Sequence, residues 1–155
     1  METPANRWKS AERADAYGEL EHPADIFLEI YGRDLPGLFE NALFALYDQL
    51  ALLEDFETTS HRHIEVQGPS VSDALRALLS EALYKFETEA FVAVHAKVRV
   101  DKQADRVKVS VDLGGDILNH EYHTVLSEVK AVTYHQLTAE ELPEGGWRAT
   151  VLFDV

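Results

Sequence analysis

Six stretches of the chain alternate between apolar and polar residues, which is the period of a half-buried β-strand. Valine is frequent in two of these stretches, 91–100 and 106–113, and the charged segment between them predicts an antiparallel hairpin. The polar segment 138–146 predicts a second hairpin, in which the chain returns into its closing strand. The six predicted strands are 18–31, 61–67, 91–100, 106–113, 128–137 and 147–155.

Two further stretches carry apolar residues at spacings of three and four, which predicts amphipathic helices. The first follows Asp34, a plausible N-cap, and has Pro36 in its first turn, where the missing N–H costs little. Its apolar stripe runs from Leu35 to Leu53. The second follows Ser70 and ends near Glu87, and Asp73 three residues after Ser70 approximates a capping box.

The elements therefore follow the order βαβα and then four strands. This order predicts an α+β fold with two layers, in which two helices pack on one face of a mostly antiparallel sheet. We expect a flexible N-terminal segment at 1–17 and a single domain at 18–155, because a chain of 155 residues can bury one sizeable core.

The charge is strongly negative: 28 acidic residues stand against 14 basic ones, for a formal net charge of -14. Such a chain repels phosphate backbones, so we expect no direct binding to nucleic acid. A basic protein partner or a cation suits this charge better. The alternative, which charge alone favours, is a solvated surface that only keeps the protein soluble.

Residue types also limit the location and the chemistry. The first seventeen residues are polar, and the chain has no apolar run long enough to span a bilayer, so we expect a cytoplasmic protein without a membrane partner. The chain contains no cysteine, which excludes disulfides and thiolate ligands. Any metal must therefore be bound by oxygen or imidazole.

Carboxylates at two places in the chain are not explained by the requirements of the fold. Asp25 interrupts an otherwise regular strand, and Asp154 stands beside the terminal carboxylate of Val155. Two carboxylates about 4 Å apart repel by about 4 kcal/mol at an effective dielectric constant near 20, unless a cation or a proton intervenes. If Asp25 lay near this terminus, three hard oxygen donors would suit calcium or magnesium. Alternatively, Asp25 faces water on the polar side of its strand.

The stretch 128–135 carries Lys130, Tyr134 and His135 among β-branched residues. Alternation places Lys130 and Tyr134 on one face, which is either a contact surface or the solvated side of a strand. The pair His120 and His123 lacks the spacing of a helical metalloprotease motif. No phosphate-binding loop or nucleophile elbow is present in the sequence, so we expect no enzymatic chemistry of the chain's own.

Taken in order, five motifs of the sequence resemble those of the archease family. They are Glu21-His22-Pro23-Ala24-Asp25, Leu38-Phe39-Glu40-Asn41-Ala42 after Tyr31-Gly32, the helix ending at 81–89, the strand at 128–135, and Trp147-Arg148 with Phe153-Asp154-Val155. The resemblance covers residues 18 to 155.

Archeases assist the tRNA-splicing RNA ligase by promoting guanylylation of its active-site histidine, and so permit multiple turnover. The resemblance implies a non-catalytic activator of such a ligase that touches this partner transiently. It also implies metal ligands at Asp25, Asp154 and the terminal Val155. The implied cofactor is a divalent cation, calcium first, with magnesium and manganese as alternatives.

The sequence departs from the family pattern at Pro23, where threonine is usual, and this removes a backbone donor next to Asp25. Asp116 lies where the family often has a glutamate, which implies a further acidic contact, and Lys130 is implied as a contact to the ligase. Two other functions stay open. They are a general chaperone or modulator of RNA-modifying enzymes, and a metal-dependent hydrolase that uses the same carboxylates.

Overall fold

The computed structural model describes residue 8 and residues 12–21 and 25–155. The helices in this part of the chain are α1 (Arg13–Ala16), α2 (Leu35–Leu50) and α3 (Val71–Glu89), with a 3-10 turn, η2, at Leu53–Asp55. The strands are β1 (Tyr17–Leu20), β2 (Ile26–Gly32), β3 (Ser60–Gly68), β4 (Phe91–Lys102), β5 (Val107–Ile117), β6 (Ala131–Val132), β7 (Thr138–Glu141) and β8 (Trp147–Asp154).

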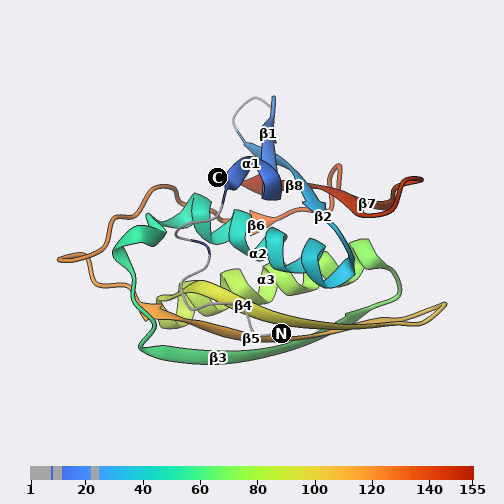
Figure 1. Ribbon diagram of the computed structural model, residues 1–155. Helices are drawn as coiled ribbons and strands as arrows, with labels where there is room; N and C mark the ends of the chain where they lie inside the picture. The colour runs from blue at the N-terminus through green and yellow to red at the C-terminus, as the bar shows by residue number, and fades with distance from the viewer. Residues whose placement is uncertain (1–7, 9–11, 22–24) are drawn as a thin grey trace.

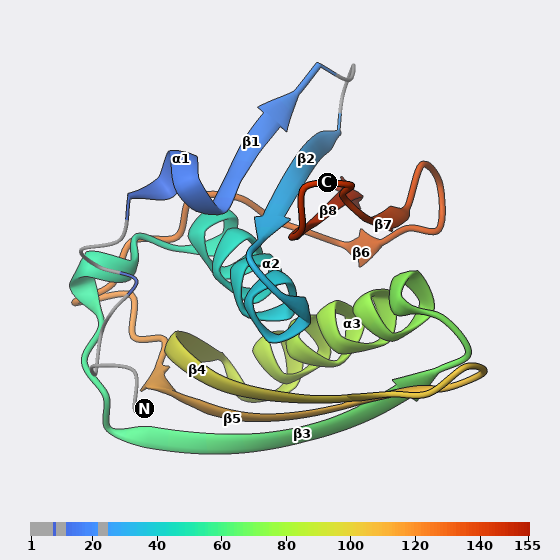
Figure 2. The ribbon, with the colours of Figure 1, turned by 45° about the vertical axis from the view of Figure 1, so that its right-hand side comes forward.

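The strands form two antiparallel sheets, which confirms the predicted α+β class. The first, which we call the upper sheet, has the order β1-β2-β8-β6, and β7 also pairs with β8. The second, the lower sheet, has the order β3-β5-β4. Helices α2 and α3 lie between the two sheets (Figures 1 and 2). None of the described helices combines the length and apolar character needed to cross a bilayer.

This layering differs from the prediction of two helices on one face of a single sheet. The reason lies in α2, where the residues from Ala42 to Tyr47 are all buried. A helix that covers one sheet keeps a polar stripe toward solvent, whereas α2 is apolar nearly all round and packs against both β2 and β4. The strands therefore divide between two sheets.

Both predicted helix starts are confirmed. The Asp34 carboxylate accepts a hydrogen bond of 2.8 Å from the Gly37 N–H, and the Ser70 hydroxyl oxygen accepts one of 3.2 Å from the Asp73 N–H. These side chains satisfy backbone donors that have no partner within the first turn of a helix.

Two of the predicted strands are interrupted. The stretch 18–31 divides into β1 and β2, which pair with each other. Within 128–137 only Ala131 and Val132 are strand, because Gln136 has a φ of 57° and a Leu137 N–H to Tyr134 oxygen bond closes a turn. The chain resumes as β7, within the segment that was predicted to be a turn, and β7 pairs with the same edge of β8 as β6.

Trp8 belongs to the segment 1–17 and is fully buried. Its ring stacks on Phe44 and Tyr47 of α2, with centroid distances of 5.5 and 6.3 Å. Farther along the same segment, Arg13 forms a 2.8 Å ion pair with Asp48, also on α2. These residues connect the start of the described chain to the central helix.

Candidate cation site

The register of the upper sheet determines where Asp25 lies. Ile26, the first residue of β2, pairs with Phe153 of β8, and the two strands are antiparallel. The residue before Ile26 therefore faces the residue after Phe153, which puts Asp25 beside Asp154. Asp25 is half-buried in the bend that precedes β2, and Asp154 is exposed at the end of β8. His22, Pro23 and Ala24 lie outside the described residues, and so does the departure at Pro23.

The end of β8 is also held from its other edge. Ala131 of β6 pairs with Asp154, and the Lys130 N–H donates a 2.7 Å hydrogen bond to the Asp154 main-chain oxygen. Val155 follows directly, with 38% of its surface exposed. The backbones of Asp25, Asp154, Val155 and Lys130 are therefore neighbours at one edge of the upper sheet, where β2 begins and β8 ends, near the C-terminus marked in Figure 1.

The donors at this edge are of one chemical kind. Asp25 and Asp154 each offer a carboxylate side chain, and Val155 offers main-chain oxygen. Within residues 8, 12–21 and 25–155, no group of three or more His, Asp or Glu side chains could hold a metal ion. A cation at this edge would depend on the main-chain oxygen of Val155 as well as on the two side chains. A hard cation such as calcium, which takes six to eight oxygens, would fill its other positions with carbonyls or water.

Asp116 lies elsewhere, near the end of β5 in the lower sheet. Its Oδ1 atom accepts hydrogen bonds from the Thr59 hydroxyl, at 2.6 Å, and from the Ile117 N–H, at 2.8 Å. Its Oδ2 atom lies 3.8 Å from His123 Nε2. Asp116 therefore anchors the loops at this end of the lower sheet and does not share the edge with Asp154.

His123 is a structural histidine. Its ring stacks on Phe56 with a centroid distance of 3.9 Å, and its Nδ1 atom accepts a 2.8 Å hydrogen bond from the Asn119 N–H. The interpretation that His120 and His123 are not a metal-binding pair agrees with this placement. The sequence offers no sign of the stacking, because Phe56 belongs to a distant loop.

Arg76 is a residue that the sequence analysis missed, and it contacts Tyr134. The Tyr134 side chain is 66% exposed, and the Arg76 guanidinium of α3 lies 3.6 Å from the centre of its ring. The buried Nε atom of Arg76 has no hydrogen-bond partner among the described residues. Arg76 stands in an ordinary helical pattern, and only the fold brings it beneath the loop after β6.

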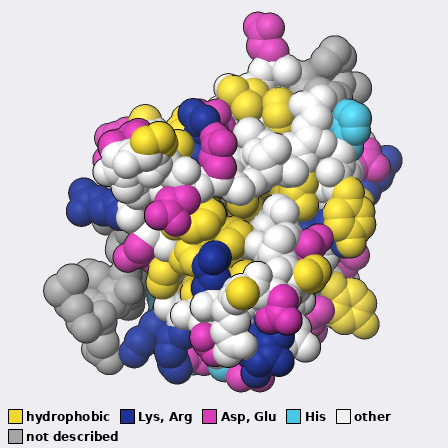
Figure 3. Space-filling view, turned by 90° about the vertical axis from the view of Figure 1, so that its right-hand side faces the viewer, with side chains coloured by type: hydrophobic (Ala, Val, Ile, Leu, Met, Phe, Trp, Pro, Cys, Tyr) yellow, Lys and Arg dark blue, Asp and Glu magenta, His cyan; other side chains and the backbone are white. Residues whose placement is uncertain are grey.

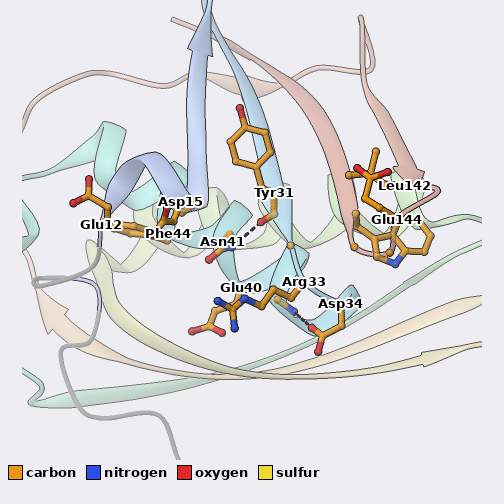
Figure 4. Close-up of a pocket in the computed structure, with 16 residues that line it drawn as sticks. Glu12, Asp15, Tyr31, Arg33, Asp34, Glu40, Asn41, Phe44, Leu142 and Glu144 are labelled. Atoms are coloured by element: carbon orange, nitrogen blue, oxygen red, sulfur yellow. Dashed lines mark hydrogen bonds between the residues drawn. The ribbon is translucent and has the colours of Figure 1, made fainter.

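A cavity of about 930 Å³ opens at the other end of β2 and β8. Seven residues of β2 separate the two ends, so the cavity lies about 20 Å from Asp25. Figure 4 shows helix residues on one side and the β7–β8 turn on the other, with Tyr31 and Asn41 between them. The lining residues are Glu12, Asp15, Ala16, Tyr31, Gly32, Arg33, Asp34, Gly37, Glu40, Asn41, Phe44, Leu142, Glu144, Gly145, Gly146 and Trp147.

This cavity is distinct from the predicted cation site. Among its lining residues, Asn41 Nδ2 donates a 2.6 Å hydrogen bond to the Tyr31 main-chain oxygen, and the Gly37 N–H donates one of 2.8 Å to the Asp34 carboxylate. The Tyr31 hydroxyl donates to Glu29 at 2.9 Å, and burial, followed by this bond, raises the pKa of Tyr31. The five carboxylates and one arginine of the lining favour cations over phosphates.

One face of the molecule carries charges of both signs (Figure 3). On the face that carries the tips of the β4–β5 and β7–β8 hairpins, acidic and basic side chains surround a central group of hydrophobic ones (Figure 3). On this face the negative net charge of the chain therefore does not form one continuous acidic surface.

Comparison with known proteins identifies the family. Residues 17–155 match the model of the Archease protein family (MTH1598/TM1083). The chain is 34% identical to protein archease of Thermococcus kodakarensis over 87% of its own length and 95% of that protein. It is 36% identical to protein archease of Archaeoglobus fulgidus over 90% of its own length and 98% of that protein. The chain belongs to the archease family.

A solved structure agrees with this assignment. The solution structure of Methanobacterium thermoautotrophicum protein 1598 superposes with a TM-score of 0.74 at 27% sequence identity. The match covers 91% of this chain and 99% of that one. The name that the two curated relatives carry, protein archease, specifies no catalytic activity.

Proposed function

We propose that this chain is a non-catalytic activator of a tRNA-splicing RNA ligase. It promotes guanylylation of the ligase's active-site histidine and so permits multiple turnover. Membership of the archease family supports an accessory role in RNA processing. The single observation that carries the finer proposal is the β2–β8 register, which puts Asp25 beside Asp154 at the edge where Val155 lies.

The proposed mechanism depends on a divalent cation, calcium first and magnesium or manganese otherwise. Asp25, Asp154 and the carboxylate of Val155 would hold this cation and leave positions open for water or for a ligand from the partner. Lys130 lies at the same edge and is exposed, so it would meet the ligase or its nucleotide. Asp116 is a weaker candidate for such a contact, because its Oδ1 atom already accepts two hydrogen bonds and it lies in the other sheet.

The test is a guanylylation assay with the ligase, GTP and magnesium or manganese, with and without the full chain. Asp25→Asn and Asp154→Asn are compared with Asp101→Asn, an exposed aspartate of β4 that serves as the matched control. We expect the unchanged chain and Asp101→Asn to increase guanylylated ligase over several turnovers, and the two site variants to do so far less. A ligase that gains nothing from the unchanged chain would contradict the proposal.

The cation is measured separately, by calcium-dependent thermal shift. Asp154→Asn, or a few residues added after Val155, should weaken cation binding by about tenfold or more, because each removes one of few ligands. A tag at the N-terminus should have no such effect. Normal calcium binding by the extended chain would show that the Val155 carboxylate is not a ligand. Protection of unrelated proteins regardless of Asp25 would favour a general chaperone, and turnover of a small substrate by the chain alone would favour a hydrolase.

A further inference from the structure

The outer face of the lower sheet carries three histidines that the proposed function does not use. His61 and His63 belong to β3, and His95 belongs to β4. In the register of the sheet, His61 pairs with Gly114 of β5, and Gly114 pairs with His95. The two histidines therefore stand in one row across three strands, with a glycine between them. Two strand spacings of about 4.8 Å put their backbones about 10 Å apart.

Gly114 allows the His95 ring to lie across the middle strand. The register of β4 shifts between Ala93 and His95, a bulge that re-aims the side chain. A Cβ atom on Gly114 would overlap Nε2 and Cε1 of the His95 imidazole. The ring thus fills the space that any other residue at 114 would need. It extends from β4 over β5, in the direction of β3 and His61.

The two imidazoles are also chemically available. Among the described residues, neither His61 nor His95 has a side-chain hydrogen bond or ion pair. Burial lowers the pKa of His95, and the charge of His61 lowers it further. His63, on the same face, differs because both of its ring nitrogens have carboxylate partners. Its Nδ1 atom lies 2.7 Å from Asp112 Oδ1, and its Nε2 atom lies 3.2 Å from Glu65 Oε1.

We propose that His61 and His95 form a two-imidazole site for a divalent transition metal ion, Zn²⁺ or Cu²⁺. Neutral imidazole is a preferred ligand of both ions, with Zn–N distances of about 2.0 to 2.1 Å. Since the described residues contain no larger group of metal-binding side chains, water completes the coordination. This site is independent of the proposed ligase activation, because it lies in the other sheet and uses nitrogen rather than oxygen donors.

The test is calorimetric titration of the full chain with Zn²⁺ at neutral pH, together with Cu²⁺ paramagnetic resonance to count the bound nitrogens. We expect His61→Gln and His95→Gln each to weaken Zn²⁺ binding about a hundredfold. Once one imidazole has bound the ion, the second binds it at a high effective concentration, and a variant with a single imidazole lacks this gain. The matched control is His63→Gln, which removes a histidine from the same face and should bind like the unchanged chain.

Gly114→Ala gives a second test that removes no ligand. Its methyl group should displace the His95 ring and weaken Zn²⁺ binding, while circular dichroism checks that the fold is kept. If this variant does not fold, His61→Gln and His95→Gln still test the proposed metal site. The proposal is overturned if His61→Gln and His95→Gln bind Zn²⁺ as well as the unchanged chain, or if His63→Gln loses as much. Asp154→Asn should keep Zn²⁺ binding, which separates this site from the carboxylates of the upper sheet.

Discussion

Asp112 contacts an imidazole and a guanidinium at once. One oxygen lies 2.7 Å from His63 Nδ1, and the other lies 3.2 Å from the Arg99 guanidinium. The hydrogen bond from His63 lowers the pKa of Asp112, and the bond to Asp112, then the bond to Glu65, raises the pKa of His63 above its ordinary value of 6.5. Each partner thus favours the charged form of the other.

The sign of the pH dependence follows from these shifts. The stabilising contribution of His63 is complete below its ordinary pKa of 6.5 and is lost as the pH rises through its raised folded pKa. The contribution of Asp112 is present above its ordinary pKa of 3.8 and is lost as the pH falls through its lowered folded pKa. The pair therefore stabilises the fold most between 3.8 and 6.5.

An NMR titration of the His63 ring checks this prediction. We expect a midpoint above 6.5 in the unchanged chain, and Asp112→Asn should move it downward. The control is Asp101→Asn in β4, because Asp101 is an exposed aspartate of the same sheet that is not bonded to His63. A midpoint that does not respond to Asp112→Asn would show that the pair does not form in solution.

At the scale of single residues, sequence reasoning named Asp25 and Asp154 as candidates but did not show that they lie side by side. Asp25 and Asp154 are far apart in the chain, and only the pairing of β2 with β8 brings them together. Both residues stood out in the sequence as carboxylates in strand patterns, while their juxtaposition depends on long-range strand pairing. Arg76 and Gly114 were missed because nothing local distinguishes an arginine under an aromatic ring or a glycine under an imidazole.

The secondary-structure elements with local signals were the predictable ones. Helix α2 begins at Leu35 because Asp34 caps it, and replacing Asp34 by alanine should lower the free energy of unfolding by about 1 kcal/mol. Urea denaturation followed by circular dichroism measures the change. Asp105→Ala, an exposed aspartate in the β4–β5 turn, is the matched control and should change little. An equal loss in both variants would show that the cap is not the cause.

The elements that were mispredicted lack such local signals. The pattern at 128–137 alternates as a strand should, but Gln136 adopts a left-handed conformation and the chain turns there. Glutamine is not a residue that favours this conformation, so the turn is imposed by tertiary contacts such as the 2.6 Å bond from the Thr150 hydroxyl to the Gln136 oxygen. The β4–β5 hairpin, whose partners are neighbours in sequence, was correct.

At the scale of the whole molecule, Trp8 tests how much the start of the chain contributes to stability. Trp8→Ala would remove a fully buried ring that stacks on Phe44 and Tyr47. We expect the free energy of unfolding to fall by about 3 kcal/mol, the cost of a large cavity in a core. Thermal and urea unfolding measure it, with Tyr122→Ala as a control because Tyr122 is 71% exposed. Equal stability of the two variants would mean that Trp8 is not packed in solution.

The number of sheets was the part of the architecture that the alternation within the strands could not predict. Each strand reveals which of its faces is apolar, but not which other strands share that face. The apolar residues around α2 were a usable signal, because Phe44 and Ala45 fall outside the stripe that one sheet would bury. A helix of this kind requires a second layer.

Helix α2 also constrains how the protein can change. Its buried side chains pack against both sheets, so a substitution that fits against the upper sheet must also fit against the lower sheet. Tolerated changes along this helix should be rare and paired with compensating ones in β2 or β4. Separation of either sheet from α2 would expose apolar side chains that also pack against the other sheet. We therefore expect the two sheets to unfold together, in one cooperative transition.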